Sequence, residues 1–526
     1  MNLHTEIAKR RTFAIISHPD AGKTTLTEKL LLYSGMIQTA GMVRAKKGRR
    51  SATSDWMAME QERGISITSS AMQFTYKDAM INVLDTPGHE DFSEDTYRTL
   101  TAADCAIMVI DAAKGVERQT RKLFEVCQLK KIPVLTLINK YDLPGREPLD
   151  LMQEVEEVLG IHSSAWNWPI GSGKEFTGVI DRRSQELQQF FKSSIGGALK
   201  ADVVRTPWKD ALPILGKEKY EALCADLDLL EHAGNPFSKE AFLKGETSPV
   251  FFASALTNFG IEPFFDAFVE LAPPPHERLA DKNDGTEILI DPEKTPFSAY
   301  VFKIQANMDK RHRDSMAFLR VCSGSFARDM SVKHHRLNRE IRLNRPHGMV
   351  AGERQTVDEA YPGDILGVIN PGVFAVGDTI SMTGGFNFKP LPHFQPEIFA
   401  KVFPKDVSKR KAFDKGVLQL ISEGAIQLLK PLDMFGDPIY AAVGQLQFEV
   451  MQYRLKDEYG VDTHLTKQPF EASAWLIGDP KTFQKPSNAL LVEDNKGRLM
   501  ALFSEPWEKR YAQQQNPNHQ LLDIMA

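Results

Sequence analysis

The stretch that decides the fold of the N-terminal half runs from Phe13 to Thr25 and reads FAIISHPDAGKTT. Its apolar start predicts a buried strand over Phe13–Ser17, and the pattern after Gly22 predicts a helix over Lys23–Tyr33. A strand, a turn ending in Gly-Lys-Thr and a helix form the context that a phosphate-binding loop requires. Backbone N–H groups of such a turn surround the β-phosphate, and the helix N-terminus adds a positive dipole. The stretch therefore predicts a nucleotide-binding α/β domain.

Individual residues of this loop have expected roles. Lys23 would reach the β- and γ-phosphates, and the Thr24 hydroxyl would bind Mg²⁺. Ser17 stands where the usual pattern has its first glycine, and serine resists positive φ. A second Gly-Lys pair, Gly173-Lys174, is followed by Glu175 where a hydroxyl residue is required, so we interpret it as a loop of an insertion.

A second motif, Asp85-Thr-Pro-Gly-His89, follows an apolar strand expected over Ile81–Asp85. An acidic residue at a strand end beside the phosphates can hold Mg²⁺ through water. Gly88 allows its backbone N–H to approach the γ-phosphate. The same residues are also typical of an ordinary turn, so this motif by itself does not decide the function.

The third and fourth motifs concern the base. Asn139-Lys-Tyr-Asp142 follows the strand expected over Val134–Asn139, and Ser254-Ala-Leu256 follows the last strand of the domain. A carboxylate accepts from both N1–H and the exocyclic amine of guanine, whereas adenine lacks this donor pair, so Asp142 indicates guanine. Ligands of open α/β sheets bind at the carboxyl ends of the strands, where all four motifs lie.

The four motifs therefore predict a GTP/GDP site. The expected nucleotide-binding residues are Ser17, His18, Pro19, Asp20, Ala21, Gly22, Lys23, Thr24, Thr25, Asp85, Thr86, Pro87, Gly88, His89, Asn139, Lys140, Tyr141, Asp142, Ser254, Ala255 and Leu256.

The length of 526 residues predicts three or four domains. Strands and helices alternate over the first 270 residues, which predicts a mostly parallel sheet, interrupted by an insertion at about 161–245. Short strands and turns then predict an all-β barrel, and two βαβ-type halves predict a ferredoxin-like α+β layer. The expected division is 1–275 for the GTP-binding domain, 276–295 for a linker, 296–390 for the barrel and 391–526 for the C-terminal domain. The stretch after about residue 481 matches no pattern that we could interpret.

Composition sets further limits. The chain has 64 Lys and Arg against 69 Asp and Glu, a net charge of −5, which argues against a polycation that coats nucleic acid. Two local basic clusters remain, at 46–50 and between Lys303 and Arg345, where eleven Lys and Arg accompany four Asp and Glu. Four scattered cysteines and the lack of a long apolar run indicate a reduced cytoplasmic protein without a membrane partner.

The motifs carry a resemblance to the translational GTPases. Asp85-Thr-Pro-Gly-His-Glu-Asp-Phe92 and Arg63-Gly-Ile-Ser-Ile-Thr68 look like the two switch signatures of that family. The resemblance implies that His89 orients the attacking water, with Lys23 and Asp85 completing the catalytic set. It also implies that Ser66, which stands where the family has a threonine, binds Mg²⁺ beside Thr24 and the water-bridged Asp85, with Thr68 as the alternative.

The resemblance is sharpest to the class II peptide chain release factors of bacteria. It rests on Ser17-His-Pro-Asp20, Lys303–Met308, Ala360–Leu366, Gly444-Gln-Leu-Gln-Phe448 and Arg454–Tyr459. It implies a ribosome-dependent GTPase in translation termination that releases and recycles class I release factors. The implied partners are guanine nucleotides, ribosomal RNA and ribosomal proteins, and class I factors indirectly through the ribosome, for a cytoplasmic monomer that binds no DNA.

Two other functions are compatible with the motifs. One is another translational GTPase, similar to an elongation factor, although 526 residues are too few for a translocase and a tRNA carrier would have two β-barrels. The other is a guanine-nucleotide-sensing scaffold without significant turnover, against which Lys23, Asp85 and His89 argue. Basic clusters are usually solvated faces, but for residues 46–50 we favour an RNA contact beside the γ-phosphate.

Overall fold

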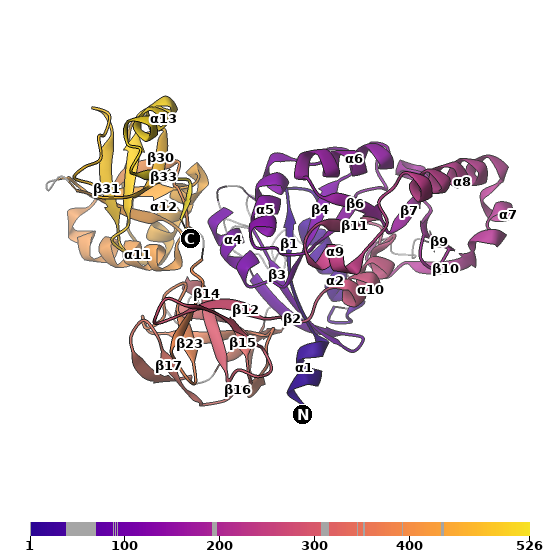
Figure 1. Ribbon diagram of the computed structural model, residues 1–526, viewed down its shortest axis with the longest axis horizontal. Helices are drawn as coiled ribbons and strands as arrows, with labels where there is room; N and C mark the ends of the chain where they lie inside the picture. Colours follow the sequence, from indigo (N-terminus) through magenta and orange to yellow (C-terminus); the bar gives the residue numbers. More distant parts are fainter. Residues whose placement is uncertain are drawn as a thin grey trace.

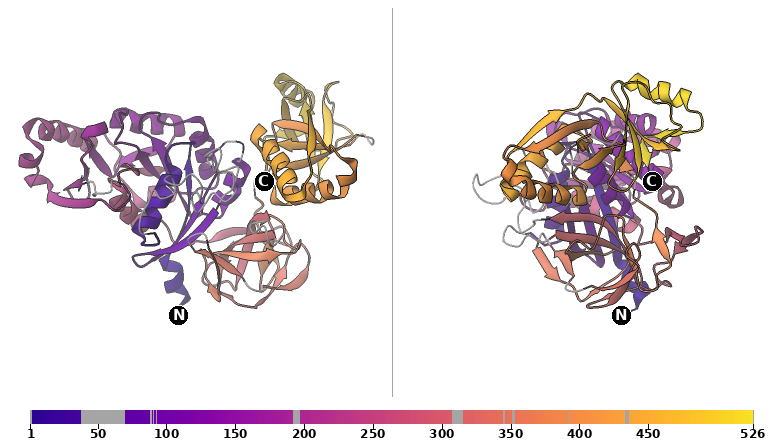
Figure 2. Two further views of the ribbon diagram at one scale, coloured as in Figure 1. Left: turned by 180° about the vertical axis from the view of Figure 1, so that it is seen from behind. Right: turned by 90° about the vertical axis from the view of Figure 1, so that its left-hand side faces the viewer.

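The structure is a computed structural model that describes residues 2–37, 70–87, 89, 91, 93–191, 197–306, 315–343, 346–350, 353–391, 393–432 and 436–525. Figure 1 shows three bodies in chain order: an α/β body, a β-rich body below it, and a C-terminal α+β body in orange and yellow. The left view of Figure 2 places the C-terminal body and the magenta region, which holds α7 and α8 in Figure 1, at opposite ends of the molecule. None of the helices in the described ranges is both long and apolar enough to cross a membrane.

The α/β body is built on a parallel sheet, as the alternating pattern predicted. Its strands run in the order β3-β1-β4-β5-β11-β6, with β2 antiparallel at the β3 edge. Their bounds are β1 (Arg10–Ser17), β2 (Ser70–Tyr76), β3 (Ala79–Asp85), β4 (Cys105–Asp111), β5 (Val134–Asn139), β6 (His162–Ala165) and β11 (Thr247–Phe252). Every residue of β4, β5 and β11 is buried, because helices cover both faces of the sheet.

The two faces of the sheet have separate cores. Ala14 and Ile16 pack with α4, α5 and α6 on one face, whereas Phe13 and Ile15 pack with α2 and α10 on the other. Successive side chains of a strand point to opposite faces, so the run Phe13–Ile16 supplies both cores. The helix bounds are α1 (Leu3–Lys9), α2 (Lys23–Tyr33), α4 (Ser93–Thr101), α5 (Arg118–Leu129), α6 (Pro148–Leu159) and α10 (Ile261–Leu271).

The stretch expected as an insertion is partly in the main sheet, because β6 pairs in parallel with β11. A separate subdomain follows, with an antiparallel four-stranded sheet in the order β10-β9-β8-β7. Its elements are β7 (Asn167–Ile170), β8 (Gly178–Asp181), β9 (Glu186–Phe191), β10 (Asp202–Pro207), α7 (Leu212–Leu215), α8 (Lys217–His232) and α9 (Lys239–Leu243).

The stretch 276–295, expected as a linker, holds two strands. β12 (Arg278–Lys282) and β13 (Glu287–Ile290) form a hairpin, and β12 also pairs with β24 (Phe386–Phe388). The signal was present in the sequence, because Asp284-Gly285 is a hairpin turn and Gly285 adopts the φ of +83° that such a turn needs. Because residues 281–287 are mostly polar, the stretch was interpreted as a linker and the hairpin was not expected.

The β-rich body is an antiparallel barrel-like sheet in the order β18-β17-β23-β14-β15-β22-β19. Its strands are β14 (Ser298–Ala306), β15 (Ser315–Ser323), β17 (Ser331–His334), β18 (Arg339–Arg342), β19 (His347–Val350), β22 (Ile365–Asn370) and β23 (Thr379–Ser381), with β20 (Glu353–Thr356) paired to β19. Val301, Leu319 and Ile380 are fully buried in its core. β19 also pairs with β2, so the sheet of the barrel continues into that of the α/β body.

The C-terminal body begins with a ferredoxin-like unit, as predicted. Chain order β26-α11-β27-β28-α12-β29 gives the sheet order β29-β26-β28-β27. Its bounds are β26 (Ile398–Pro404), α11 (Arg410–Glu423), β27 (Gln427–Pro431), β28 (Ile439–Ala442), α12 (Gln445–Tyr459) and β29 (Thr463–Lys467). The sheet then continues through β31, β32, β30 and β33, which accounts for most of the stretch after residue 481. These elements are β30 (Ala472–Ile477), β31 (Leu490–Asp494), β32 (Leu499–Phe503), α13 (Pro506–Gln515) and β33 (Gln520–Leu522).

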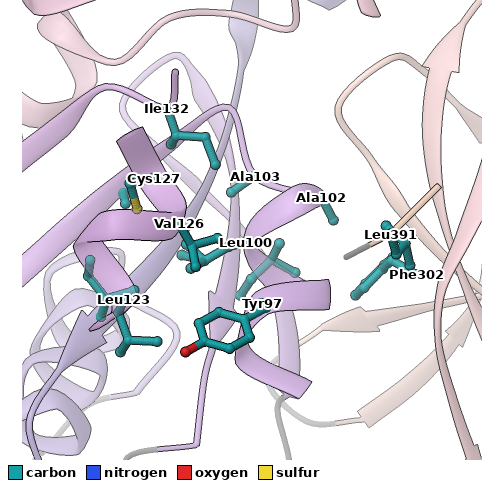
Figure 3. Packing of buried hydrophobic residues seen from close by; sticks show 14 of the residues in the cluster. Tyr97, Leu100, Ala102, Ala103, Leu123, Val126, Cys127, Ile132, Phe302 and Leu391 are labelled. Carbon is teal, nitrogen blue, oxygen red and sulfur yellow. The ribbon is translucent and has the colours of Figure 1, made fainter. Parts of the chain in front are cut away.

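Buried ion pairs join the α/β body to the barrel. Asp104 has a side chain with no exposed surface and lies 2.5 Å from Arg320 and 3.1 Å from Arg278. Arg10 donates to Asp364 at 2.9 Å. Figure 3 shows the apolar part of the interface, where Tyr97 and Leu100 of α4 lie near Leu123 and Val126 of α5, with Phe302 of the barrel and Leu391, which follows the barrel in the chain, across from them. Helix α4 is therefore packed between the nucleotide-binding sheet and the barrel.

Candidate nucleotide site

The phosphate loop lies between the end of β1 at Ser17 and the start of α2 at Lys23. Gly22 has a φ of +103°, and a Cβ there would lie 2.2 Å from Nδ2 of Asn139. Glycine is therefore needed at this position both for the backbone conformation and for the space. The α2 hydrogen-bond ladder starts at once, with Leu26 N–H donating to Gly22 O at 2.9 Å. The first N–H groups of a helix have no acceptor within the helix itself, which is what an anion-binding site at a helix start requires.

Ser17 does not strain this loop. It is the last residue of β1, where extended backbone suits any residue, and its side chain is buried. The left-handed conformation falls instead on Asp20, with a φ of +65°, and on Gly22. Serine in place of the usual first glycine is therefore compatible with the turn.

Two charged side chains stand at the phosphate end of the site. Nζ of Lys23 lies 3.6 Å from Oδ1 of Asp85, and both side chains are buried. Thr86 anchors the loop after β3, because its hydroxyl donates to the Ile15 carbonyl at 2.7 Å. Pro87 follows it, whereas Gly88 and Ser66 lie outside the described residues, as does the basic cluster at 46–50.

Asn139 joins the phosphate end of the site to the base end. Its Nδ2 donates to the Ala21 carbonyl at 2.9 Å, and its Oδ1 accepts from Ala255 N–H at 2.8 Å. The side chain is buried, so both of these backbone groups depend on it for a partner. One residue thus holds three of the four sequence motifs together.

The remaining residues that were expected to recognise the base lie at the ends of β5 and β11. Nζ of Lys140 lies 2.8 Å from Asp111, and Lys140 has a φ of +67°. Burial disfavours the charge on Asp111, but hydrogen bonds from Lys140 and from Ala113 N–H outweigh it and lower the pKa of Asp111. Tyr141 N–H donates to the Ala253 carbonyl at 3.2 Å, which fixes the two strand ends to each other.

The second Gly-Lys pair supports this base end without belonging to it. Gly173 N–H donates to the Tyr141 carbonyl at 2.9 Å, so the Gly173–Glu175 turn packs behind the base-recognition loop.

Two buried polar atoms of the site lack a hydrogen-bond partner within the described part of the protein, and a guanine nucleotide could satisfy them. Among the described residues, Oδ1 of Asp142 and Oγ of Ser17 are buried without a hydrogen-bond partner. A buried acceptor without a partner is costly unless a ligand satisfies it, and guanine presents two donors to such a carboxylate. Leu256 is 54% exposed, which leaves an apolar surface at the edge of the base site.

The donor set also fits Mg²⁺. Thr24 and Asp85 offer hard oxygen ligands at the phosphate end, and no cluster of three or more His, Cys, Asp or Glu side chains occurs in the described part of the chain. Mg²⁺ is commonly bound by one or two protein oxygens together with substrate phosphates and water, so a larger protein cage is not required.

His89 lies beyond the phosphate loop on the chain that leads into α4. Its side chain is 36% exposed, and its Nδ1 lies 3.3 Å from Oδ1 of Asp91. Asp91 was not among the expected site residues, nor were Thr120, which accepts from His18 N–H at 3.1 Å, and Asp111. Asp111 ends β4, so the rule that ligands lie at carboxyl ends of strands could have included it.

The basic cluster between Lys303 and Arg345 is divided by the fold. Arg320 is buried against Asp104, and Lys303 is buried 3.3 Å from Asp95 of α4. These two cations face the α/β body and are therefore not part of an exposed basic surface. Lys333 and Arg339 remain exposed on the barrel.

Family models match all three bodies of the chain. Residues 8–274 match the Elongation factor Tu GTP binding domain, and residues 296–383 match Elongation factor G domain 2. Residues 388–513 match the Class II release factor RF3, C-terminal domain. A crystal structure of a Thermus thermophilus protein shares the fold, with a TM-score of 0.69 at 20% identity over 93% of this chain and 72% of that chain. The fold and the site together define a translational GTPase.

Curated relatives identify the branch of that class. Proteins named Peptide chain release factor 3 are 51% identical in Gloeobacter violaceus, over 99% of this chain and 98% of the relative, and 50% identical in Synechococcus elongatus, over 98% and 93%. The Symbiobacterium thermophilum protein of that name is 49% identical over 98% of both chains. The chain belongs to the peptide chain release factor 3 family. It is a GTPase of translation termination, which confirms the fold class, the family and the activity predicted from the motifs.

Proposed function

We propose that this GTPase acts on the ribosome after peptide release, where it promotes dissociation of the class I release factor and leaves when GTP is hydrolysed. The observation that carries the proposal is the Asn139 bridge, which joins the phosphate loop to the Ala255 loop beside the buried Lys23 and Asp85 pair. This is the arrangement of a site that reads base and phosphates at once. It supports a switch in which γ-phosphate contacts order loops that hydrolysis then releases.

We infer the roles of the site residues from their places. Ser17 to Thr25 hold the phosphates, Thr86 to His89 face the γ-phosphate, and Asn139 to Asp142 with Ser254 to Leu256 hold guanine. Mg²⁺ would be held by Thr24 and Ser66 and, through water, by Asp85, and it would supply charge stabilisation of the phosphates. The protein's own contribution is to fix the phosphates with Lys23 and backbone N–H groups and to keep the site partly dry.

His89 is the residue that we assign to the attacking water. An imidazole with one protonated and one free nitrogen can accept a hydrogen bond from that water and so orient it for in-line attack. His89 lies two residues after Pro87 and is partly exposed, so an element from outside the chain can reach it. A trans-acting element can raise turnover about 10³- to 10⁵-fold, which supports slow hydrolysis alone and fast hydrolysis on the ribosome.

The barrel supplies a surface that suits ribosomal RNA. Lys333 and Arg339, both exposed, line a polar cavity of about 340 Å³ together with Asn338 and Gly384. Exposed cations beside backbone and amide donors are the usual means of binding phosphates. We infer contacts with ribosomal RNA and ribosomal proteins, action in the cytoplasm as a monomer, and an indirect effect on class I factors, with no DNA or membrane partner. The domain limits 1–275, 296–390 and 391–526 are part of the same proposal.

The test is GTP hydrolysis with and without ribosomes, together with dissociation of a labelled class I factor from termination complexes. Ribosomes should stimulate hydrolysis, and His89→Ala should keep GTP binding while losing most of the stimulation. If the wild-type protein hydrolysed GTP at the same rate with and without ribosomes, ribosome dependence would be refuted. If His89→Ala were stimulated by ribosomes as strongly as the wild type, the role of His89 would be refuted.

A further inference from the structure

A residue just after the Asp85–His89 motif contacts a second motif, Gly444–Phe448, that the nucleotide site does not use. Asp91 follows the Asp85–His89 motif of the α/β body, and Gly444 starts the Gly444–Phe448 motif of the C-terminal body. Oδ2 of Asp91 accepts a hydrogen bond of 2.6 Å from Leu446 N–H in the first turn of α12. More than 350 residues separate the two motifs in the chain, so this contact exists only in the docked arrangement of the bodies.

Asp91 supplies a side-chain oxygen that accepts from a backbone N–H at the N-terminus of α12, where the N-cap residue has none. The N-cap residue of α12 is Gly444, which has no side-chain oxygen, although Oε1 of Gln447 accepts from Val443 N–H at 2.7 Å and from Gly444 N–H at 3.3 Å. The first N–H groups of a helix need partners, and a carboxylate is favoured there by the helix dipole. Asp91 therefore acts as a cap provided by another domain.

The glycine at 444 leaves room for this cap. A Cβ on Gly444 would lie 1.9 Å from Cγ of Asp91 and 2.1 Å and 2.3 Å from its two oxygens. Gly444 has φ −142° and ψ 165°, an extended backbone that alanine adopts without strain. Alanine at 444 would therefore displace the Asp91 side chain without straining its own backbone.

The second oxygen of the same carboxylate faces His89. Nδ1 of His89 lies 3.3 Å from Oδ1 of Asp91, and in the opposite tautomer the same nitrogen accepts a hydrogen bond of 3.3 Å from Asp91 N–H. With its proton on Nδ1, the ring donates to the carboxylate, and Nε2 is then the unprotonated nitrogen that can accept. The hydrogen bond made by one ring nitrogen sets the tautomer and thus the role of the other.

The docking of α4 on the C-terminal body keeps Asp91 in this place. Arg98, which lies in α4 a few residues after Asp91, donates to the Glu423 carbonyl at 3.4 Å. Glu423 is the last residue of α11. Tyr97 packs on Phe394 with ring centroids 3.8 Å apart. The negative charge of Asp91 therefore lies at the N-terminus of α12, and the positive charge of Arg98 lies at the C-terminus of α11. The helix dipole favours these signs of charge at these ends.

We propose that Asp91 is a positioning residue for His89, and that α12 holds Asp91 in position, so that docking of the C-terminal domain controls the orientation of the histidine. The inference rests on the proposed role of His89. The Asp91 carboxylate contacts both Leu446 N–H and the His89 ring. When the contact with α12 is lost, the carboxylate is free to move away from the imidazole. The C-terminal domain then takes part in hydrolysis without touching the nucleotide.

Two variants separate the two contacts. Asp91→Asn keeps an oxygen for Leu446 N–H but removes the carboxylate from His89, and it should lower the ribosome-stimulated kcat about 10- to 100-fold, as for other groups that orient a functional histidine. Gly444→Ala keeps the carboxylate but displaces it from α12, and it should lower the same kcat about 10- to 100-fold, because a displacement of about 1 Å near a catalytic group can cost about 100-fold. The KM for GTP and the GDP affinity should stay unchanged in both.

The control is a double-mutant cycle. Gly444→Ala should have no further effect in an Asp91→Ala background, because the side chain that it displaces is then absent. Selective ¹⁵N labelling of histidine, with His89→Gln to assign the signal, should show the Nδ1–H tautomer in the wild type and its loss in Asp91→Asn. A purely structural contact would change thermal unfolding without changing this spectrum.

The outcomes distinguish this inference from the proposed function. Wild-type stimulation of both Asp91→Asn and Gly444→Ala beside a defective His89→Ala would overturn the inference alone. Additive effects in the cycle, or faster hydrolysis by Gly444→Ala without ribosomes, would also overturn it. Wild-type stimulation of His89→Ala would refute the proposed role of His89. If Gly444→Ala does not fold, the kcat and the histidine spectrum of Asp91→Asn decide the question.

Discussion

Replacing Asn139 by alanine tests the bridge that holds the nucleotide site together. The side chain makes two buried hydrogen bonds, to the Ala21 carbonyl at 2.9 Å and from Ala255 N–H at 2.8 Å. A buried polar group left without a partner costs about 1–3 kcal/mol, so two such groups cost about 2–6 kcal/mol. Part of this loss falls on the stability of the α/β domain, and the rest falls on the ordering of both loops around the nucleotide. We therefore expect the Kd for GDP to rise at least about tenfold, which corresponds to about 1.4 kcal/mol.

Asn370 provides a matched control on the barrel. Its side chain is also buried and bridges backbone groups, donating to the Phe374 carbonyl at 2.9 Å and accepting from Gly372 and Phe374 N–H. Asn370→Ala should lower the free energy of unfolding to a similar extent and leave GDP affinity unchanged. Fluorescent GDP titration and urea unfolding measure the two quantities. An Asn139→Ala protein that binds GDP within about threefold of the wild type would refute the bridge as a determinant of affinity.

Three further predictions follow from buried polar groups. Asp142→Asn should weaken GTP binding and improve binding of xanthosine triphosphate, whose exocyclic oxygen suits an amide donor; unchanged GTP affinity in the titration would contradict the base assignment. Arg320→Met should destabilise the protein to urea by up to about 3–5 kcal/mol, because buried Asp104 then keeps only Arg278 as an arginine partner, and Asp104→Leu in the same chain should restore part of the loss. Burial disfavours the charge on Glu94, but Arg98 and His393 outweigh it and lower the pKa of Glu94 to about 2. Since this folded pKa lies below the usual 4.5, the stabilisation is complete above about pH 4.5 and is lost as the pH falls toward 2, by about 3 kcal/mol in total. Glu94→Gln should flatten that part of the unfolding profile, and an unchanged slope would contradict the assignment.

The fold was predictable wherever the pattern is local. The strands after which the four motifs stand were expected within a few residues of their observed bounds, because continuous apolar runs bounded by turns are typical of buried parallel strands. The hairpin β12–β13 was not expected, since polar residues surround its short apolar run Ile288–Ile290 and β12 is held by the distant strand β24. The last part of the C-terminal sheet was missed because it joins the ferredoxin-like unit through β31, which pairs with β27 from a distant part of the chain.

The nucleotide site was predictable as a set of residues but not as an arrangement. Spacing and strand ends indicated Lys23, Asp85, Asn139 and Asp142. They did not indicate that Asn139 binds both the phosphate loop and the Ala255 loop, which depends on the distance between β1, β5 and β11 in the sheet. Nor could a count of basic residues separate Arg320, buried on Asp104, from the exposed Lys333.

The amino-acid sequence by itself determined the chemistry of this protein: a guanine-nucleotide site, the order of its domains and its family. Those features depend on short motifs. The physical requirements of these motifs, such as a positive φ at Gly22 or a carboxylate for guanine, are local. Contacts between domains had to come from the tertiary structure, because hydrogen bonds such as Asp91 to α12 join residues that no local pattern relates. The link from the C-terminal domain to His89 is therefore a property of how the bodies pack, and it is visible in neither motif alone.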